Sequence, residues 1–245
     1  MSELILEFSR FEFKYVLHRK LREAVESELG YFMQLDPFVE DVPGHRYTVR
    51  SLYFDDPHYT AFYDKIDGLK QRSKFRVRTY TKDPTVMTPV FLEEKGRYDN
   101  RVFKHRVLVG DTSDENLCLA TGPVLLDRGL DNATLEDKFR YQWFRRQIRP
   151  ITLIDYERRP YVSKYDHEFR VTFDERLYAT ETDKLFPGLL ERGRHLLPGY
   201  TVMEVKFDTR IPAWFHRILQ SHELRRVPLS KICEGMKTLK IATDL

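Results

Sequence analysis

Polar and apolar residues alternate along several segments of the chain, which is the pattern of β-strands with two different faces. The clearest case is 74–80, where every second residue from Lys74 to Arg78 is basic and the residues between are apolar or threonine. Similar segments, bounded by turn residues, predict about eight strands. They are expected at residues 4–16, 47–55, 73–81, 88–96, 101–109, 151–162, 168–174 and 200–207.

Helical spacing appears between these strands. Apolar residues recur every four positions over 17–29, which predicts an amphipathic helix. A second helix is expected to begin near Thr134, which has N-cap spacing to the acid three residues later, and to stop at Pro150. Two shorter helices are expected, one after Pro212 and one over 230–241.

The order of these elements predicts an α+β fold. Strands without regular alternation with helices favour a mostly antiparallel sheet. A packed interior would not accept the charged alternate positions, so the sheet must be closed or deeply cupped. We therefore predict an eight-stranded antiparallel β-barrel that forms a tunnel, with helices packed outside it and inserted between strands. No repeat, low-complexity tract or linker divides the chain, so residues 1–245 are expected to form a single domain.

Composition narrows the classes of partner. The chain has 41 Lys and Arg against 38 Asp and Glu, a formal net charge of +3, which argues against a broad nucleic-acid-binding surface. Cys118 and Cys233 lie far apart, so neither a disulfide scaffold nor a cysteine metal site is expected. The first residues lack the basic start of a signal peptide, and no apolar run is long enough to span a membrane. A cytoplasmic protein is the expectation.

Basic residues stand at alternate positions on nearly every predicted strand. A single Lys or Arg of this kind is ordinarily a solvated strand face. Together, they predict a cavity lined by cations, which needs anions to offset repulsion and desolvation, and phosphate oxygens suit both side chains. The residues are Lys14, Arg50, Arg76, Arg78, Lys95, Lys104, Arg106, Arg158, Arg170, Lys206 and Lys231.

Three acidic residues lie on the same strand faces as these basic residues. Glu12, Glu93 and Glu204 each precede a lysine by two residues, and alternate residues of a strand share a face. Two interpretations stay open, namely local charge neutralisation and an oxygen-only site for Mg²⁺ or Mn²⁺ shared with phosphate. The histidines have no zinc-like spacing. No glycine-rich phosphate loop is present, so a P-loop or Rossmann mechanism has no support.

Nine short sequence motifs, spread over nearly the whole chain, resemble those of a known family and occur in the same order. The motifs are Arg10–Tyr15, Arg50–Asp55, Lys74–Tyr80, Phe91–Lys95, Tyr156–Arg159, Arg170–Asp174, Met203–Lys206, Pro212–Trp214 and Ser230–Lys231. In this order they resemble the VTC domain, the polyphosphate polymerase-like branch of the triphosphate tunnel metalloenzymes, or CYTH-like superfamily. The resemblance implies a tunnel that holds triphosphate or polyphosphate with a divalent metal, Mn²⁺ or Mg²⁺.

The resemblance also implies roles for residues. All eleven basic residues named above match phosphate-contacting positions, and Glu204 matches the metal-binding glutamate, with Glu93 and Glu12 as weaker metal candidates. Arg76, Arg78, Lys95, Glu204 and Lys206 are the expected catalytic set. The first strand has only one alternating glutamate before Lys14, which favours the polymerase branch over the hydrolases and weakens a second metal. An aromatic residue commonly follows the lysine of the last motif, where this chain has Ile232.

Three functions stay open at this point. The first is a metal-dependent phosphotransferase that adds the γ-phosphate of ATP to a growing polyphosphate chain. The second is a metal-dependent inorganic triphosphatase, which a second carboxylate beside the metal would favour. The third is a non-catalytic polyphosphate-binding module. The expected partners are ATP, triphosphate or polyphosphate, and no nucleic acid.

Overall fold

A computed structural model describes residues 10–119, 121–188 and 190–244. Within these residues, ten strands form one antiparallel sheet. They are β1 (Phe11–His18), β2 (Met33–Leu35), β3 (Tyr47–Asp55), β4 (Gln71–Thr79), β5 (Pro89–Tyr98), β6 (Arg101–Asp111), β7 (Arg149–Ser163), β8 (Arg170–Glu181), β9 (Gly193–His195) and β10 (Tyr200–Phe207). The spatial order is β1-β10-β8-β7-β3-β4-β5-β6, with β2 paired to β7 and β9 to β8. The predicted α+β class and the antiparallel sheet are confirmed.

The two edges of the sheet approach each other without forming a continuous ladder. An isolated bridge joins them, in which Arg10 N donates to Val102 O at 3.1 Å and Val102 N to Arg10 O at 2.9 Å. Farther along β1, the outward carbonyl of Lys14 accepts a hydrogen bond from Val227 N at 2.8 Å instead of pairing with β6. The closed barrel that the sequence predicted is therefore not confirmed, because the segment before the last helix occupies part of this edge.

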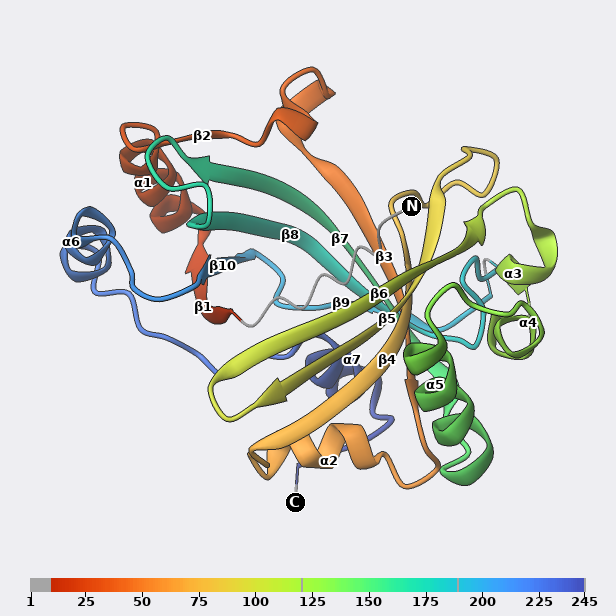
Figure 1. Cartoon of the computed structure of the whole chain (residues 1–245). Helices are drawn as coiled ribbons and strands as arrows, with labels where there is room; N and C mark the ends of the chain where they lie inside the picture. Colours follow the sequence, from red (N-terminus) through yellow and green to blue (C-terminus); the bar gives the residue numbers. More distant parts are fainter. Residues whose placement is uncertain (1–9, 120, 189, 245) are drawn as a thin grey trace.

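Seven α-helices accompany the sheet in the described residues. They are α1 (Arg19–Leu29), α2 (Thr60–Ile66), α3 (Glu115–Leu119), α4 (Thr121–Asp127), α5 (Ala133–Arg145), α6 (Ala213–Ser221) and α7 (Lys231–Leu239). Figure 1 shows α1 and α6 near one end of the sheet and α3, α4 and α5 near the other. None of these helices combines the length and apolar character needed to cross a membrane.

Strand alternation gives the sheet an outer face and a cavity face. On β4, Phe75 and Val77 point outward and pack beneath Phe139 of α5 in one apolar cluster. The outer faces of β1, β8 and β10 pack against α1 and α6 in another. Each fully buried side chain in such a cluster contributes about 1.5–3 kcal/mol of transfer free energy. The alternate residues of β4, including Arg76 and Arg78, point to the cavity face.

Helix α7 lies on the cavity face, which corrects the prediction that all helices pack outside. Its residues Ile232 and Met236 join an apolar cluster with Ile154 and Ala179 of the sheet. Gly235 permits the close approach, because a Cβ there would lie 2.6 Å from Ile154 Cδ1. The helix therefore fills one part of the cup and presents its first residue to the space that remains.

The predicted boundaries needed three further corrections. Helix α5 is capped by Asn132, whose side chain accepts from Leu135 N at 2.9 Å, and not by Thr134. The same helix ends at Arg145, and Pro150 lies inside β7, where the β3–β7 register shifts. The first helix begins at Arg19 rather than at residue 17, and residues 4–9 of the first predicted strand lie outside the described residues.

Candidate functional site

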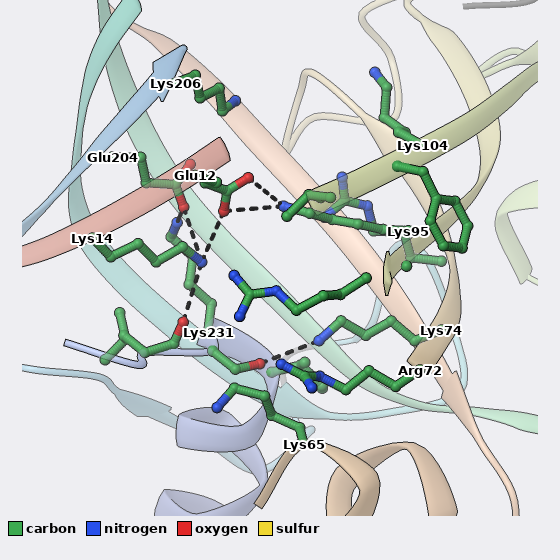
Figure 2. Close-up of a pocket in the computed structure, with 18 of the residues that line it drawn as sticks. Glu12, Lys14, Lys65, Arg72, Lys74, Lys95, Lys104, Glu204, Lys206 and Lys231 are labelled. Carbon is green, nitrogen blue, oxygen red and sulfur yellow. Dashed lines mark hydrogen bonds and ion pairs between the residues drawn. The ribbon is translucent and has the colours of Figure 1, made fainter. Parts of the chain in front are cut away.

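A cavity of about 570 Å³ lies on the cavity face of the sheet, with contributions from α2 and α7. Its described lining has fifteen Lys and Arg side chains but only two carboxylates, Glu12 and Glu204. Figure 2 shows several of these lysines pointing into one space from different strands. The basic residues are Arg10, Lys14, Lys65, Arg72, Lys74, Arg76, Arg78, Lys95, Arg97, Lys104, Arg158, Arg170, Lys206, Arg226 and Lys231. This is the surplus of positive charge that strand alternation predicted.

The structure brings together most of the residues that the sequence singled out. All the predicted phosphate-contacting residues line the cavity except Arg50 and Arg106, and so does Glu204. The lining also includes cations that the sequence reasoning missed. Lys65 comes from α2, which was not predicted, and Arg72 stands near the start of β4. Arg72 continues the alternation of a strand that was predicted, so one more step along that pattern would have found it.

Arg50 lies on the other side of the sheet. Its guanidinium donates to Asp155 through Nε at 2.9 Å and Nη2 at 2.8 Å, and to the carbonyl of Leu185 at 3.3 Å. The alternation of β3 sends Ser51 and Tyr53 to the cavity face and Arg50 to the outer face. Arg50 is therefore not placed to contact a ligand in the cavity.

Glu93 is fully buried beneath the cations and does not line the cavity. Arg76 donates to Glu93 Oε2 through Nε at 2.7 Å, and Arg106 Nε lies 3.1 Å from Glu93 Oε1. Lys104 Nζ is 3.8 Å from the same oxygen. Burial alone would raise the pKa of Glu93, but the surrounding cations lower it strongly. A carboxylate enclosed in this way does not fit the metal-ligand role predicted for it.

Arg106, which is partly exposed, is the other arginine that contacts Glu93 closely. Its guanidinium donates to Tyr80 Oη at 2.5 Å and stacks 3.6 Å from the centroid of the Phe91 ring. Together with the ion pair to Glu93, these contacts hold Arg106 away from the cavity lining. It contributes positive potential to the site rather than a contact surface.

A closed network of charges surrounds Glu204. Lys231 Nζ donates to Glu204 Oε1 at 2.5 Å, and Arg158 Nη2 donates to Glu204 Oε2 at 2.9 Å. Asp174, which is fully buried, binds the same two cations, with two hydrogen bonds from Arg158 at 2.6 and 2.7 Å and an ion pair to Lys231 at 2.6 Å. Sequence reasoning placed Asp174 in a motif but gave it no role, because its partners come from β7 and α7.

Within this network, the shifts in pKa keep Glu204 and Lys231 in their charged forms. Burial would raise the pKa of Glu204, but Lys231, Lys14 and Arg158 bring it well below its usual range. Burial would lower the pKa of Lys231, yet Asp174 and Glu204 raise it. The network is therefore a fixed set of charges and not a proton donor or acceptor near neutral pH.

Glu12 and Lys14 connect this network to β5. Lys95 Nζ donates to Glu12 Oε2 at 2.9 Å, and Lys14 Nζ lies 3.2 Å from Glu12 Oε1 and 3.4 Å from Glu204 Oε1. Figure 2 shows the Lys14 ammonium between these two glutamates. Two carboxylates from neighbouring strands thus converge on one cation.

Other cations of the lining have no acidic partner among the described residues. Lys206 makes no ion pair there, and burial together with Arg158 lowers its pKa to about 7. Lys74 donates only to the hydroxyl of Ser230, at 3.2 Å. Burial also lowers the pKa of Lys74. Both side chains would regain favourable interactions from an anion in the cavity.

The donor set is compatible with a divalent cation that arrives with phosphate. No group of three His, Cys, Asp or Glu side chains that could hold a metal is found in the described part of the chain. Glu204 and Glu12 offer hard oxygen ligands around the Lys14 ammonium. Mg²⁺ is ordinarily held by one or two carboxylates, with substrate phosphates and water completing its shell. Glu204 and Glu12 supply two such carboxylates, whose oxygens a metal would take over from the cations that now bind them, whereas Glu93 is enclosed behind the lining.

Comparison with known proteins places the chain in a family. A family model described as the VTC domain matches residues 9–240. No curated protein matches the chain. A proposed adenylate cyclase from Bacillus halodurans has a similar structure, with a TM-score of 0.54 and 13% identity over 90% of this chain and 93% of that one.

Two further solved structures are more distant. The PH1819 protein of Pyrococcus horikoshii has a TM-score of 0.46 and 11% identity over 94% of this chain and 99% of that one. A proposed adenylate cyclase from Vibrio parahaemolyticus has a TM-score of 0.45 and 12% identity over 96% of this chain and 100% of that one. The match to the family model covers nearly the whole sequence, and the chain belongs to the VTC domain family.

Proposed function

We propose that the cavity is a tunnel for triphosphate and polyphosphate, in which the γ-phosphate of ATP is transferred to a growing polyphosphate chain. The observation that carries the proposal is the excess of fifteen cations over two carboxylates around a single cavity. Membership of the VTC domain family supports the same ligand class. Such a lining is strongly unfavourable without anions, and a linear chain of phosphates supplies several in a row.

In the proposed reaction, a terminal oxygen of polyphosphate forms a bond to the γ-phosphorus of ATP, the bond from that phosphorus to the β,γ-bridging oxygen breaks, and ADP leaves. The protein acts by positioning the phosphates and neutralising their charge. Loose phosphoryl-transfer transition states need little covalent chemistry from the protein and are stabilised mainly by fixed positive charge. Glu93 and the Tyr53 hydroxyl hold Arg76, with the hydroxyl accepting from Nη1 at 2.9 Å. Asp174 and Glu204 similarly hold Arg158 and Lys231. These side chains can therefore meet phosphate oxygens with little reorganisation.

Further positive charge comes from Lys206, which has no acidic partner among the described residues, from Lys95, which is paired with Glu12, and from Arg78, which donates to Ser51 Oγ at 3.0 Å. Lys206, Lys95 and Arg78 point into the same space and would contact the oxygens of the transferred group. A divalent ion held by Glu204 with Glu12 would neutralise charge on the bridging oxygens when it is bound. We propose that Lys206, Lys95, Arg78 and Glu204 are catalytic residues, together with Arg76.

The acceptor that we propose is a phosphate and not water. A triphosphatase would activate its water with a free carboxylate or with the metal. In the described lining, Glu12 is paired with Lys95 and Lys14, and Glu204 with Lys231 and Arg158, so either role would require these cations to move from the carboxylate oxygens. Glu93, the candidate for a second carboxylate, is buried behind the lining. A terminal phosphate of polyphosphate is already ionised and needs no such base.

The test is incubation of the purified protein with ATP and Mn²⁺, with separation of polyphosphate by gel and assay of orthophosphate. We expect wild type to form long polyphosphate and Glu204→Gln to lose at least about tenfold in rate, since one anchoring charge is removed. Lys20→Met, an exposed lysine on α1, is the matched control and should retain full activity. Orthophosphate as the only product would identify a triphosphatase, and binding without turnover would identify a binding module.

A further inference from the structure

The sheet opens between β3 and β4 next to the basic cavity. The β3–β4 ladder ends at the pair Tyr53 and Arg76. Beyond this pair, β3 continues against β7 alone, and β4 continues against β5 back to Gln71. Helix α2, which contacts both strands, lies over the opening. The two sides of the sheet are therefore separated here by side chains and not by a hydrogen-bonded ladder.

A second cavity, of about 780 Å³, lies between α2 and α5 on the outer side of this opening. Ala61 of α2 and Arg72, Ser73 and Lys74 of β4 line both cavities. Figure 1 shows α2 beside the start of β4 and α5 to its right, in the lower half of the view. A ligand could thus occupy both spaces at once, with its middle part beside Arg72 and Lys74.

The second cavity differs in chemistry from the first. Its described lining has five carboxylates and four Lys or Arg, so it has no excess of positive charge for phosphate. Its floor contains the buried side chains of Phe54, Phe75 and Ile148. At the rim, Tyr141 of α5 is 58% exposed. An apolar floor and an exposed aromatic ring suit a flat, uncharged organic group.

Polar groups with free hydrogen-bonding capacity surround that floor. Asp55 and Asp56 are already used, because Asp55 accepts from Ala61 N at 2.9 Å and Asp56 from Thr60 N at 3.1 Å. By contrast, the side chains of Asp64, Gln71 and Gln142 have no hydrogen bond or ion pair within the described residues. A carboxylate and two amides can bind sugar hydroxyls and the polar edge of a base.

We propose that the second cavity binds the nucleoside of the nucleoside triphosphate whose phosphates lie in the basic cavity. The assignment rests on the proposed function, because it needs the triphosphate in the first cavity. The base stacks on Tyr141, and Asp64 accepts a hydrogen bond from a ribose hydroxyl or an exocyclic amine. Arg72 and Lys74 then lie beside the phosphate nearest the sugar.

The test is calorimetric titration of ATP and of inorganic tripolyphosphate into wild type, Tyr141→Ala and Phe144→Ala. Phe144 is a matched control, because it is also an exposed aromatic residue of α5, at 61%, but does not line the cavity. Stacking of a base on an aromatic ring is worth enough that Tyr141→Ala should weaken ATP binding about fivefold or more. Tripolyphosphate affinity should be unchanged in both variants, and ATP affinity unchanged in Phe144→Ala.

The outcomes separate this assignment from the proposed function. ATP affinity unchanged in Tyr141→Ala would overturn the nucleoside site while leaving the phosphate tunnel standing. An equal loss for ATP and tripolyphosphate would also overturn it, because the variant would then act on the phosphates. A wild-type protein that binds neither ligand would overturn the proposed function, and the nucleoside site with it.

Discussion

The ammonium of Lys14 already has acidic partners inside the cavity. It lies 3.2 Å from Glu12 Oε1 and 3.4 Å from Glu204 Oε1, and it donates to the carbonyl of Leu229 at 3.2 Å. Burial would lower the pKa of Lys14, but the two glutamates raise it. Much of its charge is therefore already balanced, and Lys206, which has no acidic partner among the described residues, offers more to a phosphate.

Lys104 gives a prediction about pH. Burial lowers the pKa of Lys104 to about 8, although Glu93 acts in the opposite direction. A lysine with a lowered pKa loses its charge as the pH rises through that value, so its contribution to anion binding is lost over the same interval. Between about pH 7 and about pH 9, tripolyphosphate affinity should fall more steeply for wild type than for Lys104→Met.

Titration calorimetry at several pH values measures this difference, and ionisation of the ligand cancels because it is common to both proteins. Lys20→Met should follow the wild-type profile. Parallel profiles for wild type and Lys104→Met would show that Lys104 keeps its charge throughout.

Asp174 gives a prediction about stability. It is fully buried and binds both Arg158 and Lys231, so Asp174→Asn leaves two buried cations with Glu204 alone. Breaking a buried ion pair by removing one partner costs about 3–5 kcal/mol. We expect urea unfolding to show a loss of that order, partly recovered by tripolyphosphate. The exposed Asp127→Asn is the control, and a loss below about 1 kcal/mol for Asp174→Asn would contradict the account.

For single residues, the sequence predicts which side chains share a strand face better than it predicts what surrounds each side chain. Alternation on β4 correctly placed Arg76 and Arg78 on the face that lines the cavity. It could not decide which face of β3 points inward, so Arg50 was assigned to the wrong side. The enclosure of Glu93 depends on neighbours from β4 and β6, and that information requires the register of the sheet.

At the element scale, the position of α7 gives a further prediction. A Cβ on Gly235 would lie 2.6 Å from Ile154 Cδ1 and 3.2 Å from Ala179 Cβ, so Gly235→Val must push the helix away from the sheet. Overpacking of this kind costs about 1–3 kcal/mol. Chemical unfolding should show that loss, with lower tripolyphosphate affinity because Lys231 moves with the helix. Glu234→Ala, on a partly exposed position of α7, should change neither quantity.

The elements that the sequence missed share a physical cause. Helix α2 has seven residues, which is too short for a repeating apolar stripe, and its start is held by the side chains of Asp55 and Asp56. Strands β2 and β9 have three residues each and are extended only because they pair with longer strands. Pro150 was taken as the end of a helix, yet it occupies a shift of register in β7.

In the whole molecule, the positive and negative charges are nearly equal in number but are unevenly distributed. The chain carries a net charge of only +3, whereas the described lining of one cavity has fifteen cations and two carboxylates. Acids therefore cover other surfaces. A cavity of about 570 Å³ accommodates a chain of phosphates but is too small for a nucleic-acid duplex. This separation of charge is what the proposed binding of a phosphate chain requires.

The measurement that tests the central claim most directly is calorimetric titration of inorganic tripolyphosphate into wild type, Lys206→Met and Lys20→Met at two salt concentrations. The account predicts saturable binding that weakens as salt increases, because the contacts are ionic. It predicts a loss of about tenfold or more in Lys206→Met, since one close phosphate contact is removed, and no change in Lys20→Met. Absence of binding to wild type, or equal affinity of all three proteins, would contradict the claim that this cavity is a phosphate tunnel.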